Sequence, residues 1–547
     1  MKRRDFCLLS GGTVAGAGIQ RALGALPAQT QASKEHPNII FLMTDQQRWD
    51  ALGCSDPRVH TPNLDRLAKT GVHFRQAVCN VPMCMPSRYS MLLGLYPAQS
   101  GVRCNAQMIP DDESLPAAPL PEILRQAGYQ TAGFGKTHWY EPLPADRMKP
   151  AGFAPTTRGF EVRSCEHGGV HREPGSVYYA EDNLPGARAV FEEQKAERGR
   201  HPEAVQFGGS DGPWSFIGWD SKVAPEHHMG GWLTNQCLTF LETGRDASRP
   251  LFLYLSLDEP HAPIRPPQKY TELYSIDEIP DFPIPPWGVR EREPNGHVGP
   301  DAEVSCRKDL YDATYPVWKE MTPKERREVT LRYWAYCSFV DDLFGKVLDS
   351  LESKGILENS LIVFCSDHGD MMGERLFRTS KYNLYDGAVR VPMILSGSVI
   401  PESRRGEVSD APASLVDVVP TLLSNAGLEH PLVYPGINLM EQSNAGSYAE
   451  YHGAGCEGIE RAPALMWRTD EWKLILYAPG QLKQRDRLLN GLKGELYNLK
   501  DDPDEWNNLF GQDAVQDVQQ RLTQELLYHV AITGSLFPRV STLTTVA

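Results

Sequence analysis

The sequence lacks several features that mark specialised classes of protein. It has no C-x-x-C pair, no repeat of fixed period, no low-complexity tract and no apolar run long enough to span a membrane. Its 11 cysteines are scattered irregularly, which argues against a disulfide framework or a structural zinc site. There is no excess of positive charge either: the formal net charge is −15, which disfavours a nucleic-acid partner. With 547 residues and 41% hydrophobic content, the chain is predicted to be globular and to form more than one structural unit.

Residues 1–30 are typical of an export signal. Lys2, Arg3 and Arg4 form a basic head, and a modest apolar stretch rich in Gly and Ala follows. The Arg3-Arg4 pair resembles a bacterial twin-arginine signal, which exports folded proteins. An ordinary secretion signal or a retained anchor is the alternative. We therefore expect a bacterial protein that works in the periplasm or outside the cell, with no membrane attachment after signal removal.

Continuous apolar runs alternate with helical patterns along the chain. The runs at 38–43, 131–134, 251–256 and 361–365 are typical of buried parallel strands, and helices are predicted at 63–70, 121–127, 231–243 and 324–354. This alternation predicts an α/β layer fold over residues 36–434. Short strands at 464–469, 472–477 and 494–497 and a helix at 515–530 predict a smaller α+β domain at 435–547. Segments 140–226 and 275–322, rich in Gly, Pro and charge, are predicted to be loop-heavy insertions that shape a binding site.

Each of the four predicted strands ends in polar residues. Ligands of open α/β sheets bind outside the carboxyl ends of the strands, so these ends are expected to meet. A single Asp after a strand is more often a cap or turn residue, but four such ends together favour a metal site with anion-binding groups. The oxygen ligands suit calcium or magnesium, and the histidine next to the second aspartate moves the preference toward manganese. The polar residues are Asp45 and Gln46, Lys136 and His138, Asp258 and His261, and Asp367 and His368.

Cys84 opens a second segment of interest. Pro86 lies early in a run of helix formers, so Cys84 is predicted to lie at a helix N-terminus, which favours an anionic nucleophile or substrate. The cysteine is then either activated or a buried structural thiol, and without the residues around it the structural thiol is the favoured interpretation.

The run Cys84-Met85-Pro86-Ser87-Arg88 resembles the sulfatase signature C-x-P-S-R, and Leu93-Gly94 resembles its trailing turn. Residues 128–138 resemble the second signature of that family, G-Y-x-T-x-x-x-G-K-x-H. Further matches are the P-H-x-P run at 260–263, the D-H-G run at 367–369, Lys381 with the R-V-P run at 390–392, and the stretch at 495–503. The resemblance covers residues 37 to about 509 and is collinear.

This resemblance implies an alkaline-phosphatase-like α/β/α sandwich with a smaller C-terminal α+β domain. It implies that a separate formylglycine-generating enzyme oxidises Cys84 to formylglycine, whose hydrate attacks sulfur through one hydroxyl. A divalent cation, calcium with manganese as the alternative, would be held by Asp45, Gln46, Cys84, Asp367 and His368. The implied charge-stabilising residues are Arg88, Lys136 and Lys381, with His261 as the acid for the leaving oxygen and His138 as the base that releases sulfate.

Two departures from the commonest family pattern bear on specificity. Asp45-Gln46 stands where many members have two aspartates, and Asp367-His368 where many have Asp-Asn; both variants occur in phosphonate monoester hydrolases and choline-sulfatase-like relatives. The expected substrate is nevertheless a small organic sulfate, a sulfated saccharide above all. The alternatives are a phosphonate monoester or phosphodiester hydrolase, a choline or aryl sulfatase, and, least favoured, a non-enzymatic binding protein. Possible substrate contacts, each individually more typical of a solvated loop, are His167, His171, Arg172, His227 and His228.

Overall fold

The computed structural model describes most of the chain from residue 36 onward. The described residues are 36–105, 107–109, 112–139, 158–164, 185–200, 213–281, 316–374, 379–429, 432–452, 464–477, 493–535 and 544–545. The predicted signal at 1–30, and with it His167, His171 and Arg172 of the first insertion, therefore lies outside the described residues.

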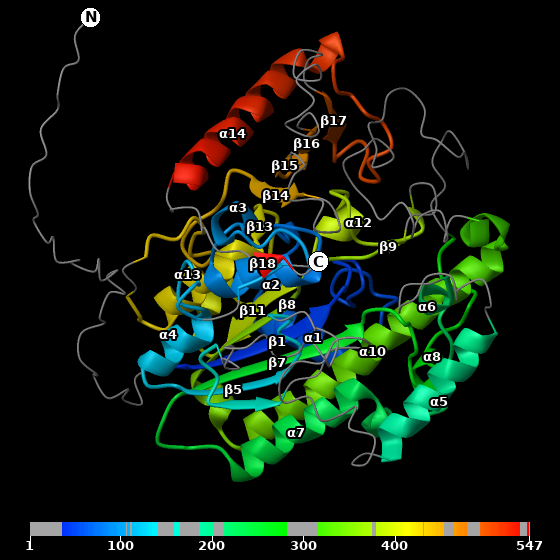
Figure 1. Cartoon of the computed structure of the whole chain (residues 1–547), viewed down its shortest axis with the longest axis vertical. Helices are drawn as coiled ribbons and strands as arrows, with labels where there is room; N and C mark the ends of the chain where they lie inside the picture. The colour runs from blue at the N-terminus through cyan, green and yellow to red at the C-terminus, as the bar shows by residue number, and fades with distance from the viewer. Residues whose placement is uncertain are drawn as a thin grey trace, which may run out of the picture.

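An eight-stranded sheet forms the centre of the molecule (Figure 1). Four neighbouring strands within it are parallel to one another, whereas β11 (Met393–Gly397) runs antiparallel to both β8 (Ser360–Ser366) and β2 (Val72–Phe74). These four are the predicted strands, as expected for continuous apolar runs that are covered on both faces. In spatial order the strands are β12 (Glu407–Ser409), β2 (Val72–Phe74), β11 (Met393–Gly397), β8 (Ser360–Ser366), β1 (Asn38–Asp45), β7 (Leu251–Pro260), β5 (Gln130–Gly135) and β6 (Val162–Ser164).

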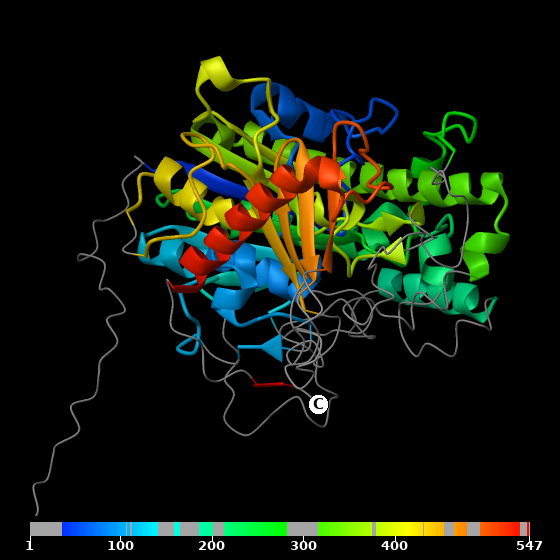
Figure 2. The same cartoon turned by 90° about the horizontal axis from the view of Figure 1, so that it is seen from above.

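Helices cover both faces of this sheet, which gives the predicted α/β/α sandwich (Figures 1 and 2). Alternate side chains of β1 enter two separate cores: Ile39 and Phe41 pack on one face, Ile40 and Leu42 on the other. The first core is covered by α2 (Cys84–Leu93), α4 (Leu120–Gln126) and α13 (Val418–Asn425), and the second by α1 (Pro62–Thr70), α7 (Met229–Thr243) and α10 (Pro323–Ser353).

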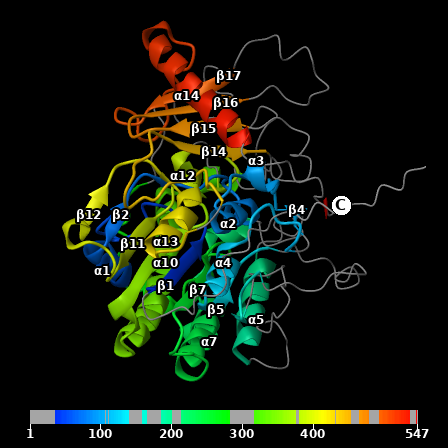
Figure 3. The ribbon, with the colours of Figure 1, turned by 90° about the vertical axis from the view of Figure 1, so that its left-hand side faces the viewer.

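A second, antiparallel sheet lies toward the C-terminal end of the chain (Figure 3). Its strands, in order, are β14 (Ser447–Tyr451), β15 (Ala464–Arg468), β16 (Trp472–Tyr477) and β17 (Lys493–Asn498). One face, with Trp467 and Leu474, packs against α14 (Gln516–Ser535), and the other, with Met466 and Ile475, joins the core of the large sheet. The C-terminal part therefore packs against the large sheet through a shared apolar core.

Short elements complete the described fold. They are the pairs β3 (Ala77–Val78) with β13 (Ala413–Ser414), β9 (Met371–Met372) with β10 (Thr379–Ser380) and β4 (Gln107–Met108) with β18 (Thr544–Thr545), and the helices α3 (Pro97–Ser100), α5 (Pro185–Gly199), α6 (Pro213–Ile217), α8 (Gln268–Thr271) and α12 (Asp386–Val389). Single-turn 3₁₀ helices are η2 (Pro225–His227), η3 (Ile356–Asn359), η4 (Glu402–Arg404), η5 (Leu415–Asp417) and η8 (Asp513–Val515).

The predicted helices and strands agree with these elements to within a few residues at their ends, with α14 running on to Ser535. Many of the shorter elements were not predicted, and α5, β11 and β14 are examples. The insertion at 140–226 contains α5, whose alanines, glutamates and lysine favour a helix although its sequence has little amphipathic pattern. Strands β11 and β14 are short and lack a diagnostic period. The domain boundary between 434 and 435 stays a prediction.

In the part of the chain that the structure covers, no helix has both the length and the apolar character needed to cross a bilayer.

Candidate active site

Two adjacent strands place the first four predicted ligands side by side. Strands β1 and β8 pair in parallel with Thr44 opposite Ser366, so the residues that follow each strand emerge together. Asp45 and Gln46 come from β1, Asp367 and His368 from β8, and all four are buried. The backbone N–H of Gln46 donates to Asp367 Oδ1 at 3.1 Å, which ties the two strand ends together.

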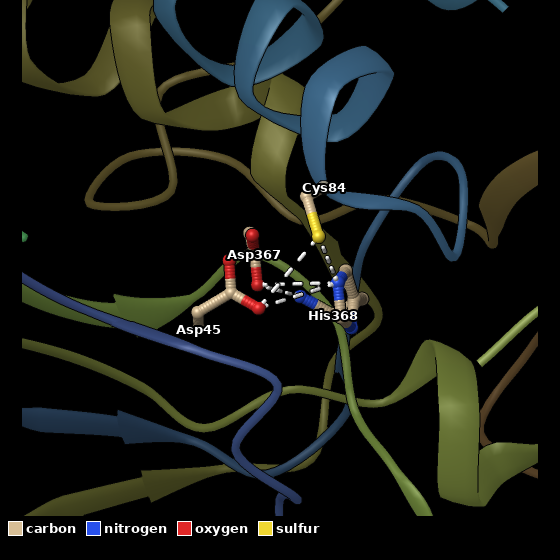
Figure 4. A group of neighbouring side chains, drawn as sticks. All are labelled: Asp45, Cys84, Asp367 and His368. Atoms are coloured by element: carbon tan, nitrogen blue, oxygen red, sulfur yellow. Dashed lines mark hydrogen bonds and ion pairs between the residues drawn. The ribbon is translucent and has the colours of Figure 1, made fainter. Parts of the chain in front are cut away.

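Cys84 is the first residue of α2 and points toward these ligands from the helix N-terminus (Figure 4). Its Sγ lies 3.2 Å from His368 Nε2 and 3.7 Å from Asp45 Oδ1. The ligand atoms of Asp45, Cys84, Asp367 and His368 all lie within 4.8 Å of one another. Two carboxylates, an imidazole nitrogen and the residue 84 side chain around one point are a donor set that fits a divalent cation.

The imidazole of His368 is oriented to act as a ligand. Its Nδ1 lies 2.8 Å from the carbonyl of Gly369, so the ring donates there and leaves the lone pair of Nε2 facing Cys84. Burial, together with Lys381, lowers the pKa of His368 to about 4, although Asp367 and Asp45 oppose this shift. The ring is therefore neutral near pH 7, as metal binding requires.

Arg88, one turn further along α2, organises the carboxylates. Its Nε donates to Asp367 Oδ2 at 2.8 Å and its Nη2 to Asp45 Oδ2 at 3.0 Å. Its Nη1 donates to the carbonyl of Lys136 at 2.6 Å and to Ser256 Oγ at 2.9 Å. The guanidinium is fully buried, and its hydrogen bonds to both carboxylates favour a role in holding them in place.

Lys136 enters the site from β5. Its Nζ lies 2.7 Å from Asp45 Oδ2 and 2.9 Å from Asp258 Oδ1. Burial opposes the charge, but Asp258 and Asp45 outweigh it and raise the pKa of Lys136 above its ordinary value. The preceding Gly135 has φ 91°, and a Cβ there would lie 1.9 Å from the carbonyl oxygen of Ser256, so only glycine permits this approach of β5 to β7.

Lys381 reaches the site from a hairpin rather than from a strand of the large sheet. Strands β9 and β10 pair antiparallel, which brings Lys381 back beside the residues that follow β8. Its Nζ donates to Cys84 Sγ at 2.8 Å and to Gln46 Oε1 at 2.9 Å, and lies 3.1 Å from His261 Nε2. Although burial opposes the charge, interactions with Cys84, Tyr382 and Asp45 raise the pKa of Lys381. A protonated amine therefore contacts the side chain of Cys84.

The two histidines lie at the ends of β7 and β5. His261 Nδ1 lies 2.6 Å from the carbonyl of Ala262, so Nε2 faces Lys381 and the site. Burial and Lys381 oppose protonation of His261, but Asp45 and a hydrogen bond with Cys84 raise its pKa overall. His138 is buried two residues beyond Lys136 and has a left-handed backbone with φ 53°.

Left-handed backbone is concentrated at this site. Of the six non-glycine residues with positive φ in the described chain, Gln46, His138, Ser380 and Tyr382 lie in or directly beside the predicted site. Such conformations persist only where the surrounding structure fixes them, and they cluster at functional sites.

Further residues support the site although the sequence gives them no role there, and Asp258 and Asn105 are two of them. Asp258 is a strand-end residue, and the structure pairs it with Lys136. Asn105 accepts a hydrogen bond from the backbone N–H of Met85 at 3.1 Å and so supports the start of α2. The N-cap residue of this helix, Met83, makes no capping hydrogen bond with its side chain. Contacts of this kind join residues far apart in sequence and leave no local pattern.

Of the histidines proposed as substrate contacts, the structure describes His227 and His228, and neither joins the site. His227 is exposed on η2, and His228 is buried with its Nε2 3.2 Å from Ser221 Oγ and its ring against Phe339. These contacts of His228 indicate that it packs at the start of α7 and does not line the candidate site.

Comparison with known proteins places this geometry in a family. The sulfatase family model matches residues 37–428, and a model for the C-terminal part of N-sulphoglucosamine sulphohydrolase matches residues 373–531. An ulvan-active sulfatase of Formosa agariphila is 28% identical over 93% of this chain and 84% of its own length. An N-acetylglucosamine-6-O-sulfatase of Bacteroides thetaiotaomicron is 24% identical over 93% of this chain and 88% of its own length. The structure of a phosphonate monoester hydrolase of Agrobacterium radiobacter shares the fold, with a TM-score of 0.68 and 21% identity over 91% of this chain and 96% of that one.

Proposed function

From the premise that this chain belongs to the sulfatase family and hydrolyses sulfate esters, we propose that its substrate is a sulfated carbohydrate and that its nucleophile is a formylglycine made from Cys84. The observation that carries the second part is the position of Cys84. Its side chain stands at the helix N-terminus within reach of two carboxylates, an imidazole and a lysine amine.

The proposed metal is calcium, held by Asp45, Gln46, Asp367, His368 and residue 84. The clustered donor atoms and the abundance of oxygen among them support a hard cation, and the nitrogen of His368 makes manganese the alternative. The family implies such a metal, and when bound it supplies positive charge that acidifies the nucleophile and neutralises sulfate oxygens. Lys136 and Arg88 keep Asp45 ionised for this role: burial opposes ionisation, yet these and other cations hold its pKa well below the usual range.

The protein's own groups would then divide the work of hydrolysis. Lys381, 2.8 Å from the side-chain atom at position 84, stabilises negative charge on the attacking group. His261, whose pKa is raised, donates a proton to the ester oxygen as the bond between that oxygen and sulfur breaks. His138 accepts the proton that must be removed before sulfate can leave. These assignments follow the family resemblance and the contacts around residue 84.

A carbohydrate leaving group is supported by the names of the relatives. One acts, by its name, on the 6-O-sulfate of N-acetylglucosamine, and the C-terminal model that matches this chain is that of an enzyme named for sulphoglucosamine. We propose a saccharide sulfate on this basis. Release of sulfate from a panel of sulfated monosaccharides and oligosaccharides should exceed release from choline sulfate, and the reverse order would overturn the carbohydrate assignment.

Mass spectrometry of the peptide that contains residue 84 tests the nucleophile. The chain is produced with a formylglycine-generating enzyme, and its activity is followed on an aryl sulfate. We expect an aldehyde in place of the thiol and activity that scales with the converted fraction, whereas Cys84→Ala should be folded and inactive. Full activity with an unmodified thiol would overturn the proposal.

We also propose export through the twin-arginine route, supported by the sequence of residues 1–30. Replacing Arg3 and Arg4 by lysines should leave the protein in the cytoplasmic fraction of a bacterial host; continued export would show that another signal operates.

A further inference from the structure

The segment that carries Lys381 has a demanding backbone. Ser380 and Tyr382, the residues on either side of Lys381, both have left-handed conformations, with φ 65° and φ 79°. Neither residue is glycine, so each conformation is unfavourable unless neighbouring structure imposes it. The direction of Lys381 therefore depends on restraints before and after it in the chain.

The restraint before Lys381 is the β9–β10 hairpin, in which Ser380 pairs with Met371. The restraint after it is α12, which begins at Asp386, five residues further on. In Figures 1 and 3, α12 lies between the C-terminal sheet and the central sheet. The start of α12 is held by side chains of the C-terminal sheet and of the loop after it.

Asp386 is bound by three cations. Arg468 of β15 donates to it from Nε at 3.0 Å and from Nη2 at 2.9 Å, and Lys473 of β16 lies 2.7 Å from its Oδ1. Arg390 donates to its Oδ2 at 3.2 Å. Burial opposes ionisation of Asp386, but Arg468, Lys473 and Arg390 together hold its pKa well below the usual range.

Glu505 completes this cluster from the loop after β17. Its Oε1 accepts from Lys473 Nζ at 2.6 Å, and its Oε2 accepts the backbone N–H of Asp386 at 2.7 Å. Glu505 itself has a left-handed backbone with φ 59° and is 3% exposed, and Lys473 is fully buried. The residue before α12 is fixed in the same way, because the hydroxyl of Tyr385 donates to Glu495 of β17 at 3.2 Å.

We propose that Lys473 and Glu505 are positioning residues for catalysis, which act through Asp386 to aim Lys381 at the nucleophile. Neither residue contacts the site. They fix the start of α12, and this anchor together with the hairpin keeps Lys381 Nζ within hydrogen-bond distance of residue 84 and Gln46. Small displacements of a catalytic group cost large factors in rate, so loosening α12 should lower kcat more than it changes KM. The inference rests on the catalytic role given to Lys381 in the proposed function.

The test is the double variant Lys473→Met with Glu505→Gln in the full, formylglycine-containing chain, assayed on an aryl sulfate. It removes the buried pairing of Lys473 with both Glu505 and Asp386 without changing the net charge. The amide oxygen of the glutamine at position 505 keeps an acceptor for the Asp386 N–H. The matched control is Lys500→Met with Glu471→Gln, which removes a more exposed ion pair with a 3.5 Å separation beside the same sheet. Both variants are also made in a Lys381→Ala background.

We expect the buried-pair variant to lose about 10- to 100-fold in kcat with KM within about 3-fold, and the control to stay within about 2-fold. In the Lys381→Ala background the buried-pair variant should lose less than about 2-fold more, because the residue it positions is absent. A kcat within 2-fold of the parent, or equal losses of kcat in both backgrounds, would overturn the inference and show that the cluster only stabilises the fold.

Three further outcomes are decisive. If the double variant does not fold, Glu505→Gln alone becomes the test, since it retains every cation, and an unchanged kcat would overturn the inference. If Lys381→Ala keeps the parent activity, the role assigned to Lys381 fails and the inference fails with it. If Lys381→Ala is inactive while both cluster variants keep the parent kcat, only the inference fails.

Discussion

Replacement of Arg88 by lysine tests whether the buried guanidinium organises the candidate metal site. Arg88 lies between the two carboxylates and donates to both, and it also donates to the carbonyl of Lys136 and the hydroxyl of Ser256. Lysine preserves the charge, but its ammonium is a single point and cannot reproduce the planar fork. One of the two carboxylates, Asp45 or Asp367, must then give up its guanidinium partner while it stays fully buried.

The magnitude follows from the hydrogen bonds that lysine cannot form. One charge-assisted hydrogen bond contributes about 1.5–3 kcal/mol and one neutral hydrogen bond about 0.5–1.5 kcal/mol. Arg88→Lys is therefore expected to lower the free energy of unfolding of the metal-free protein by about 2–4 kcal/mol. Because Arg88 donates hydrogen bonds that orient the candidate ligands Asp45 and Asp367, the metal affinity of Arg88→Lys should also fall by about 10- to 100-fold.

Urea unfolding in the presence of a chelator measures the first effect, and a calcium titration of activity measures the second. Arg75→Lys is the control, because Arg75 forms the same kind of fork with Asp410 at the surface. This control should change the free energy of unfolding by less than about 0.5 kcal/mol and leave the titration unchanged. If Arg88→Lys behaves like Arg75→Lys in both assays, Arg88 does not organise the ligands.

Three further predictions concern the metal, the acid and the response to pH. A chelator should abolish aryl sulfatase activity and calcium should restore it; restoration by manganese alone would exclude calcium as the working ion. His261→Gln should slow hydrolysis of alkyl or sugar sulfates by about 10²–10⁴-fold but that of 4-nitrophenyl sulfate much less, and equal losses on both would contradict its role as acid. Burial, with Arg265, lowers the pKa of His228 to about 3, so the unfolded chain binds a proton that the folded chain does not. The free energy of unfolding is therefore unaffected by His228 above about pH 6.5 and falls by about 1.4 kcal/mol for each pH unit between about pH 6.5 and 3. Between pH 7 and 5 the parent should therefore lose about 2 kcal/mol more than His228→Gln in urea unfolding, and parallel curves would contradict this.

The sequence predicts the inner part of the fold because its signals are local. A continuous apolar run followed at once by polar residues is a strand end, and parallel strands bring such ends to one edge. The structure accordingly brings Asp45, Gln46, Asp367 and His368 together and places Lys136 beside them. Asp45 and Asp367 are far apart in the sequence, and the pairing of β1 with β8 alone brings them side by side.

Other parts of the site depend on contacts that no short window contains. Lys381 follows no apolar run, and only the family resemblance singled it out; its place is set by the β9–β10 hairpin. Asp386, Lys473 and Glu505 are ordinary charged residues in the sequence, and their significance comes from burial and from each other. Side-chain pairs that link two sheets produce no periodic pattern in the sequence, so composition and spacing could not predict them.

The burial of residues 84 to 88 has a consequence for the order of events in the life of the chain. Cys84 is 2% exposed, and Pro86, Ser87 and Arg88 are buried beneath the central sheet's polar edge. An enzyme that recognises this pentapeptide cannot bind it once α2 has packed against the rest of the protein. The proposed oxidation therefore has to occur before folding is complete. If the chain also leaves the cytoplasm already folded, the oxidation has to take place before export. Every molecule that folds before it is oxidised then keeps an unmodified Cys84 and stays inactive. The yield of active enzyme is then set by the relative rates of oxidation and folding, and slower folding at low temperature should raise the converted fraction.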